Sequence, residues 1–338
     1  MKKLKILRVG IIGLGVGAYH LENYMKNINC EVHSVCDFDK KKLIHYKKKY
    51  RNISFYENVE DIFNNKKLDI ISIASFDNFH YEQIVRSIKN NINIFIEKPL
   101  CLKRKELLSI IKLFRKNSHI VMSSNMVLRC NPRFEYLRKL YKSKKFQDLY
   151  FIEGDYYWGR PFKLSQWRAK IDNYSIILGA AIHLIDLIIW IIGQRPTHIE
   201  AIGNRIGYQS KMIKSNLFSS INLIFKSNLI VNIKSHGLTP HPHFHSLKFY
   251  SKNKTFIHQF NEAFMINKSN MKKIHKINKP YPFKKNRSKI LDSFVNKVLR
   301  KKISEDYVAF DEIIDVMSIC LTAIESEKSG KKLKIKYY

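Results

Sequence analysis

The sequence predicts an α/β protein: a doubly wound parallel sheet in residues 1–124, then an α+β domain with a mostly antiparallel, open sheet in residues 125–338. In the first part, short apolar runs alternate with segments of helical periodicity, which is typical of a parallel sheet covered by helices. In the second part, alternating apolar and polar runs follow one another with few helices between them, which favours antiparallel pairing. The length of 338 residues agrees with two domains.

The elements of the first domain follow from this alternation. A buried-strand pattern at 7–12 leads through a glycine-rich turn into a helical stretch that reaches Met25. Further strands are expected at 31–36, 69–74, 93–96 and 120–123, with helices at 81–89 and 105–116. We expect the first domain to end after the last of these strands, near Ser124.

The second domain reads as strands with one apolar helix among them and two helices at its end. Residues 268–289 are basic and contain prolines, so we expect a loop there. The expected strands are 149–158, 199–206, 217–225, 229–235 and 247–250, and the expected helices are 176–192, 288–299 and 310–328.

The charge of the chain restricts its partners. The 61 basic and 28 acidic side chains give a formal net charge of +33, a balance that can indicate a nucleic-acid or acidic-membrane partner. The lysines, however, are spread over the whole length, and no basic run is interleaved with stacking aromatics. We therefore expect no nucleic-acid partner, although retardation of random duplex would test this alternative. The charge does favour an anionic small substrate.

Cysteines and apolar segments bear on location. The five cysteines are scattered without CxxC spacing, which argues against disulfides and zinc and for a reducing, cytoplasmic compartment. The apolar stretch 1–18 is interrupted by Arg8 and by glycines, unlike a secretory signal. The stretch 176–192 carries His183 and Asp186 near its middle, so we expect no membrane span.

The glycines carry the first functional signal. The chain has 12 glycines; four lie between Gly10 and Gly17, and none follows until Gly154. The run Gly13-Leu14-Gly15-Val16-Gly17-Ala18 is GxGxxA between a strand and a helix, the setting of a dinucleotide fingerprint. We expect Gly13 to make the tight turn, Gly15 to let a pyrophosphate approach, and Ala18 to permit close helix–strand packing. The helix N-terminus would favour the negative charge.

Asp37 points to the type of dinucleotide. It ends the expected second strand, about 20 residues after the fingerprint, where a carboxylate accepts hydrogen bonds from a ribose 2′-hydroxyl and repels a 2′-phosphate. This favours NAD. The neighbouring Lys40, Lys41 and Lys42 leave NADP open as an alternative.

Four motifs together resemble one known family. GLGVGA at 13–18, ASFDNFH at 74–80, EKPL at 97–100 and HLIDL at 183–187 come in the order and spacing of the Gfo/Idh/MocA oxidoreductases, the glucose-fructose oxidoreductase and inositol dehydrogenase group. The last helical run, 319–331, is similar to that family as well. The resemblance implies an N-terminal Rossmann domain. It also implies a C-terminal sheet domain whose open face makes homo-oligomers, either dimers or tetramers.

The resemblance also implies roles for single residues. Lys98, at the carboxyl end of an expected strand, resembles the lysine that hydrogen-bonds the reacting hydroxyl, and His183 resembles its general base. These residue types suit the chemistry, since histidine titrates near neutrality and a lysine cation stabilises a developing oxyanion. The implied cofactor contacts are Gly13, Gly15, Val16, Gly17, Ala18, Asp37, Ser75, His80, Glu97, Lys98, Asn125, Trp167 and Arg168, and the implied substrate contacts are Lys98, Arg168, Tyr174, His183 and Asp186.

One position departs from the family pattern. The family often has a carboxylate four residues before the histidine, but here that residue is Gly179. Asp186, Asp172 or a bound water is expected to take its place, or the activity is altered; Asp186, one turn after His183, could also bind substrate hydroxyls. Family branches that act on nucleotide-linked sugars are less strict here. The run 167–175 is similar to members encoded with surface-polysaccharide genes, and Arg168 would suit a uronate or a diphosphate.

A group of histidines offers an alternative site. His236, His241, His243 and His245 could suggest a metal, but Pro240 and Pro242 between them indicate a loop that leads into a strand. We expect no metal there and favour a substrate-contacting role for this segment.

These features predict an NAD-dependent oxidoreductase that moves a hydride between nicotinamide and a secondary alcohol of a sugar or nucleotide sugar, with surface-polysaccharide biosynthesis as a setting. Two alternatives with the same fold stay open. One is an NADP-dependent reductase, and the other is a member that binds cofactor without net turnover, as Gly179 would suggest.

Overall fold

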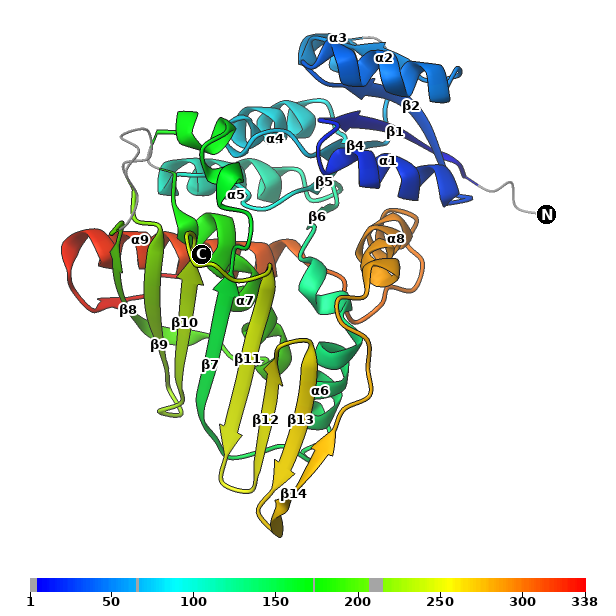
Figure 1. Cartoon of the computed structure of the whole chain (residues 1–338). Coiled ribbons are helices and arrows are strands. Elements are labelled where there is room, and N and C mark those ends of the chain that lie inside the picture. Colours follow the sequence, from blue (N-terminus) through cyan, green and yellow to red (C-terminus); the bar gives the residue numbers. More distant parts are fainter. Residues whose placement is uncertain (1–4, 65–66, 173, 207–214) are drawn as a thin grey trace. The chain divides into compact units, whose positions relative to one another are not determined.

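The computed structural model describes residues 5–64, 67–172, 174–206 and 215–338. The chain forms two compact units, Met1–Asn125 with Arg287–Ile314, and Met126–Asn286 with Asp315–Tyr338; each is described by itself (Figure 1). The expected division into 1–124 and 125–338 therefore needs a correction, because Arg287–Ile314 returns to the first unit. The reason is packing: Phe294 of this segment is fully buried, with its ring centroid 5.4 Å from that of Phe95.

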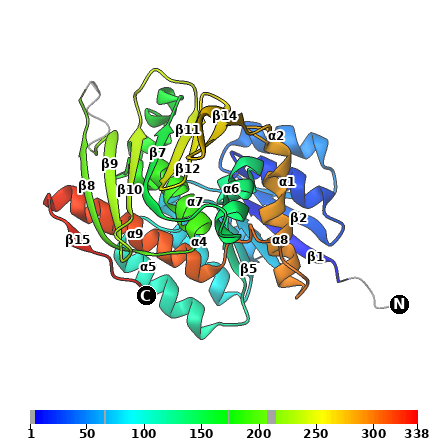
Figure 2. The same ribbon diagram turned by 90° about the horizontal axis from the view of Figure 1, so that it is seen from below.

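The first unit is built on a parallel sheet of six strands in the order β3-β2-β1-β4-β5-β6. This confirms the doubly wound sheet. Helix α8 lies beside α1 in both views (Figures 1 and 2). The strands are β1 Leu7–Ile12, β2 Cys30–Cys36, β3 Ser54–Tyr56, β4 Ile70–Ile73, β5 Asn93–Ile96 and β6 Met122–Ser124, and the helices are α1 Gly17–Lys26, α2 Lys40–Lys49, α3 Val59–Asn64, α4 His80–Lys89, α5 Arg104–Lys116 and α8 Ser288–Val298.

The second unit is built on a mixed sheet of nine strands in the order β14-β13-β12-β11-β7-β10-β9-β8-β15. Every pair of neighbours is antiparallel except β7 and β10, which confirms a mostly antiparallel sheet. The strands are β7 Leu149–Tyr157, β8 Pro196–Asn204, β9 Phe218–Phe225, β10 Ile230–His236, β11 Phe244–Ser251, β12 Lys254–Gln259, β13 Glu262–Asn267, β14 Asn270–Lys276 and β15 Leu333–Lys334, and the helices are α6 Pro132–Lys142, α7 Ile182–Ile192 and α9 Phe310–Ser329. Residues 310–314 of α9 belong to the first unit and the rest to the second.

The alternation of buried and half-exposed residues along the strands shows that one face of this sheet is covered. Along β9 and β10, buried residues alternate with half-exposed ones, so one face is packed and the other is open. The packed face meets α7 at Gly154, where a Cβ would lie 3.3 Å from the side chain of Leu184. Without that Cβ the helix can approach the strand closely.

Two sequence expectations in this unit are corrected. The expected helix at 176–192 begins with a π-helical turn, Ile177–Ala181, and continues as α7 until Gly193, whose positive φ of 65° ends it. The expected loop at 268–289 contains strand β14, all of whose residues are exposed. Its lysines sit on the edge strand of the sheet, where charge discourages pairing with another chain.

Candidate active site

The fingerprint loop joins β1 to α1 and depends on three glycines. Gly13 has φ +93°, and a Cβ there would overlap the Ala74 carbonyl oxygen, so only glycine fits. A Cβ on Gly15 would meet no described atom within 4 Å, which leaves its backbone open to a ligand. Gly17 approaches Ala74 closely, because a Cβ there would lie 3.1 Å from that of Ala74, and the next residue, Ala18, is half-buried.

Asp37 follows β2 and faces this loop. Its carboxylate accepts hydrogen bonds from the backbone N–H of Leu14 at 2.5 Å and of Asp39 at 2.8 Å, and the residue is only 5% exposed. The Lys42 Nζ lies 3.8 Å from the same carboxylate. Asp37 therefore ties the end of the second strand to the fingerprint loop, while a carboxylate still has lone pairs for further donors.

A buried hydrogen-bond network lies at the carboxyl edge of the sheet. The Glu97 carboxylate accepts from Asn125 at 2.6 Å and lies 3.1 Å from the His20 ring, whose other nitrogen is 2.9 Å from the Ser72 hydroxyl. Burial alone would raise the pKa of Glu97, but these hydrogen bonds and the nearby Lys98 cation together lower it. Glu97 is thus held as a carboxylate beside Lys98.

The turn after β5 is held in place by the His80 ring. Lys98 is half-buried and precedes Pro99 through a cis peptide bond. The His80 ring nitrogens lie 2.7 Å from the Pro99 carbonyl oxygen and 3.3 Å from that of Ser75. Since His80 is 0% exposed, the expectation that it touches a cofactor is corrected: it joins two loops of this edge. The Ser75 hydroxyl donates to Gln83 at 2.7 Å.

His183 stands on α7 in the second unit and is surrounded by rings. The Tyr156 ring stacks on it at 5.8 Å with an interplanar angle of 9°, and the His245 ring lies edge-on at 6.4 Å. The His245 ring is itself 2.6 Å from the Tyr281 hydroxyl, and His243 bonds the Trp158 carbonyl oxygen at 2.9 Å. The segment 243–245 thus lies against His183, although no group in the described part of the chain could hold a metal ion.

Asp186 does not line an accessible surface. It is 1% exposed, and both of its oxygens accept from Arg129: Nε lies 2.9 Å from Oδ2, and Nη2 lies 2.5 Å from Oδ1. The expected contact between Asp186 and a substrate hydroxyl is therefore corrected to a buried ion pair. Nothing in the local sequence around Asp186 identifies Arg129 as its partner, because 57 residues separate them.

The space beside Gly179 is filled by Tyr174. A Cβ on Gly179 would overlap the Tyr174 hydroxyl and would lie 3.5 Å from the Trp158 ring. Tyr174 is 2% exposed. The expected substrate contact at Tyr174 therefore becomes a packing contact with the helix that carries His183.

Arg168 is held between two tryptophans. Its guanidinium carbon lies 4.1 Å from the Trp167 ring centroid and 5.2 Å from that of Trp158, a cation–π arrangement. Burial lowers the pKa of the neighbouring Lys163, and the charges of Arg160 and Arg168 lower it further. Three cations thus gather here, and no described carboxylate forms an ion pair with them.

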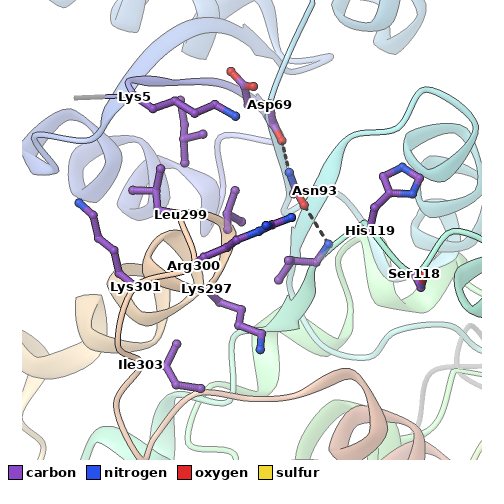
Figure 3. A pocket seen from close by; sticks show the side chains of 13 residues that line it. Lys5, Asp69, Asn93, Ser118, His119, Lys297, Leu299, Arg300, Lys301 and Ile303 are labelled. Atoms are coloured by element: carbon purple, nitrogen blue, oxygen red, sulfur yellow. Dashed lines mark hydrogen bonds between the residues drawn. The ribbon is translucent and has the colours of Figure 1, made fainter. Parts of the chain in front are cut away.

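Figure 3 shows a cavity of about 820 Å³ in the first unit. Asn93 braces its wall, donating to the Asp69 carbonyl oxygen and accepting from the Val121 N–H, each at 2.8 Å. These residues lie at the amino ends of the strands, opposite the fingerprint edge, so this is not the dinucleotide site. The exposed Lys297 and Arg300 on its rim sit at the end of α8, where cations complement the helix dipole.

Sequence reasoning missed His20, Arg129 and Tyr156. His20 has a detectable signal, since it is one turn into the helix after the fingerprint and a polar residue there faces the sheet edge.

Among the helices of the described residues, none is long and apolar enough to span a bilayer.

Comparison with known proteins gives several inositol dehydrogenases among the curated relatives. An inositol 2-dehydrogenase/D-chiro-inositol 3-dehydrogenase of Lactiplantibacillus plantarum is 24% identical over 208 residues, which is 59% of this chain and 56% of that protein. An inositol 2-dehydrogenase of Corynebacterium glutamicum is 24% identical over 58% of this chain and 57% of its own length. The chain is thus matched over little more than half the length of these curated relatives.

Solved structures share the fold over nearly all of the chain. The myo-inositol 2-dehydrogenase of Lactobacillus plantarum superposes with a TM-score of 0.84 at 22% identity, covering 98% of this chain and 100% of that one. The WlbA dehydrogenase of Bordetella pertussis, solved with NADH and UDP-GlcNAcA, gives 0.81 at 16% identity, covering 98% and 100%.

Two family models match consecutive parts of the sequence. Residues 7–125 match the oxidoreductase family with an NAD-binding Rossmann fold, and residues 134–257 match the GFO/IDH/MocA C-terminal domain. Because the two matches cover more than half of the chain, it belongs to the Gfo/Idh/MocA family of oxidoreductases.

Proposed function

We propose that this protein is an NAD-dependent dehydrogenase or reductase acting on a secondary alcohol of a sugar or nucleotide sugar. The observation that carries the proposal is the carboxyl edge of the first sheet, where the open backbone of Gly15, the carboxylate of Asp37 and the Lys98 side chain belong to one unit. Open α/β sheets bind ligands at this edge.

The residues of this edge fit NAD. The pyrophosphate would approach the backbone at Gly15 and the N-terminus of α1, and the remaining lone pairs of Asp37 would accept from the ribose hydroxyls. When bound, NAD supplies the hydride acceptor. A second cofactor, NADP, is favoured by one observation, the Lys42 Nζ at 3.8 Å from Asp37, where a cation could meet a 2′-phosphate.

Lys98 and His183 have distinct roles in the proposal. The Lys98 ammonium donates to the reacting hydroxyl oxygen and stabilises the negative charge that develops on it. The His183 imidazole takes the hydroxyl proton during oxidation and returns it during reduction. The ring stacking by Tyr156 fixes the plane of that imidazole.

The substrate carries a negative charge in this proposal. Arg168 is half-buried between Trp158 and Trp167, and neither it nor Lys163 or Arg160 has a carboxylate at ion-pair distance among the described residues. The Arg168 Nε is buried and has no hydrogen-bond partner there. A uronate carboxylate or a diphosphate would satisfy this group of cations. The UDP-GlcNAcA bound by the WlbA dehydrogenase is a ligand of that chemistry.

We also propose a homo-oligomer that pairs the open faces of the second sheet. This face carries both signs of charge, with Glu153 between Lys234 and Lys248 at 2.7 and 3.4 Å. A second copy can therefore dock without the repulsion that a chain of charge +33 otherwise meets. A monodisperse 40.1 kDa species in light scattering at micromolar concentration would contradict this proposal.

Turnover of a panel of substrates tests the function. NADH formation is measured with myo-inositol, UDP-glucose and UDP-glucuronate, and the last is expected to give the highest kcat/KM. Lys98→Ala and His183→Ala should each lower kcat by roughly 10²–10⁴-fold. His183→Ala should leave NADH affinity unchanged, since its role is chemical. Full activity in His183→Ala would remove His183 from the proposed mechanism, whereas absence of NADH formation by the unmodified protein with every substrate would leave cofactor binding without turnover.

A further inference from the structure

His20 lies on the buried face of α1, although its side chain is polar. It shares this face with Gly17, Leu21 and Tyr24, and it is only 1% exposed. Buried polar groups need hydrogen-bond partners, because an unsatisfied donor or acceptor inside a protein lowers its stability. The partners of the imidazole therefore indicate what His20 does.

Both ring nitrogens of His20 meet polar groups of the first unit. Nε2 lies 3.1 Å from the Oε1 of Glu97, and Nδ1 lies 2.9 Å from the hydroxyl of Ser72 on β4. The ring also stands edge-on to Phe95, with the two ring centroids 5.2 Å apart. These three contacts fix both the position and the plane of the imidazole.

The chemistry of the partners assigns the hydrogens of this network. A carboxylate only accepts hydrogen bonds, so the hydrogen between His20 and Glu97 belongs to Nε2. The Asn125 amide donates to the same Oε1 at 2.6 Å. The Nδ1 of the neutral ring then accepts from the Ser72 hydroxyl, and the hydrogen bonds run in one direction, from Ser72 through His20 to Glu97.

The network holds one oxygen of Glu97 and leaves the other open. Oε1 accepts from His20 and Asn125, whereas no donor among the described residues bonds Oε2, and the side chain is 13% exposed. Burial raises the pKa of Glu97, but the hydrogen bonds from His20 and Asn125 and the charge of Lys98 lower it overall. Because this coupling is mutual, the carboxylate favours the Lys98 ammonium by the same free energy.

We propose that His20 is a positioning residue that holds the Glu97 carboxylate in one orientation, so that its negative charge stays at a fixed place beside Lys98. This inference rests on the proposed function, in which the Lys98 ammonium stabilises the charge that develops on the reacting oxygen. A charge that is already in place needs no reorganisation during the reaction, whereas a carboxylate that can turn does. Loss of this anchor should therefore lower kcat more than it changes KM.

Two substitutions of His20 separate the anchor from simple packing, since both remove the ring that contacts Phe95. The amide of His20→Gln reaches the place of Nε2 and can still donate to Glu97, whereas the shorter side chain of His20→Asn reaches only the place of Nδ1. For UDP-glucuronate oxidation with NAD, kcat should fall roughly five- to tenfold in His20→Asn and by less than about twofold in His20→Gln. An equal fall in both variants would overturn the inference.

A double-mutant cycle tests whether His20 acts through Glu97. In a Glu97→Gln background the charge is gone, so adding His20→Asn should lower kcat little further. If the two losses multiply instead, His20 does not act through Glu97 and the inference is wrong. His33→Asn is the matched control, because His33 on β2 also lies 3.1 Å from a glutamate, Glu31, and its replacement should leave kcat unchanged.

Proton NMR gives a readout without turnover. The buried Nε2–H of His20 should give a slowly exchanging downfield signal that is kept in His33→Asn, moved in Glu97→Gln and lost in His20→Asn. Absence of this signal from the unmodified protein would overturn the anchor. If the unmodified protein forms no NADH with any substrate of the panel, the proposed function fails and this inference with it. If that protein is active and the two His20 variants are alike, the inference alone fails.

Discussion

Asp186→Ala is expected to destabilise the second unit rather than to remove a substrate contact. Asp186 and Arg129 are each 1% exposed, and the carboxylate accepts three hydrogen bonds from the guanidinium. The substitution leaves Arg129 as a buried charge without its counter-ion. Breaking a buried pair on one side costs about 3–5 kcal/mol, which corresponds to a fall in the urea midpoint of roughly 1–3 M.

Urea unfolding followed by circular dichroism measures this effect, and two variants make it specific. Glu262→Ala breaks a pair with Lys276 in which the two side chains are 47% and 58% exposed, so a loss of only about 0–1 kcal/mol is expected. Arg129→Met/Asp186→Leu removes both buried charges and should be more stable than either single change. If Asp186→Ala unfolds like the unmodified protein but has a strongly raised KM, the reasoning fails and Asp186 is a substrate contact.

Three further predictions concern the first unit. Gly13→Ala should cost about 1–3 kcal/mol of unfolding free energy because of its positive φ, whereas Gly15→Ala should keep its stability and lose NADH affinity in calorimetry. Asp37→Ala should narrow the preference for NADH over NADPH; tighter NADPH binding by the unmodified protein would refute the assignment. Because the pKa of Glu97 is lowered on folding, its carboxylate stabilises the fold at pH values above the ordinary glutamate pKa of about 4.3, and this stability is lost as the pH falls below it. Glu97→Gln should therefore make the free energy of unfolding depend less on pH in the acid range.

The sequence predicts best what depends on neighbouring residues. The apolar residues locate β1 and β5 to the residue, because a strand buried in a parallel sheet is apolar at most of its positions. The glycine spacing locates the tight turn at Gly13, because the positive φ of that turn suits glycine alone. The close approach of Gly17 to Ala74 does not follow from the glycine spacing, because it depends on a residue 57 positions further along the chain.

Interactions between distant residues escape this reasoning. His20 meets Glu97 across 77 residues, and Arg133 reaches the Lys279 carbonyl across 146. The edge strand β14 is missed because its lysines give no apolar alternation, and its partner β13 alone defines it as a strand. The return of Arg287–Ile314 to the first unit escapes for a similar reason, since amphipathic periodicity in α8 shows that one face is buried but not against which sheet.

Position 179 shows the difference between what a local sequence pattern predicts and what the packing of the folded chain determines. The sequence establishes that a carboxylate is missing there, and from nearby acidic residues it suggests Asp186 or Asp172 as the substitute. Chemical type alone guides that choice. Packing follows volume as well, and the space left by a glycine on a buried helix is filled by whichever side chain reaches it. Here that side chain is an aromatic ring five residues earlier, whose hydroxyl brings a polar atom to the same place. A departure from a family motif is therefore best examined by asking which side chain fills the vacated volume.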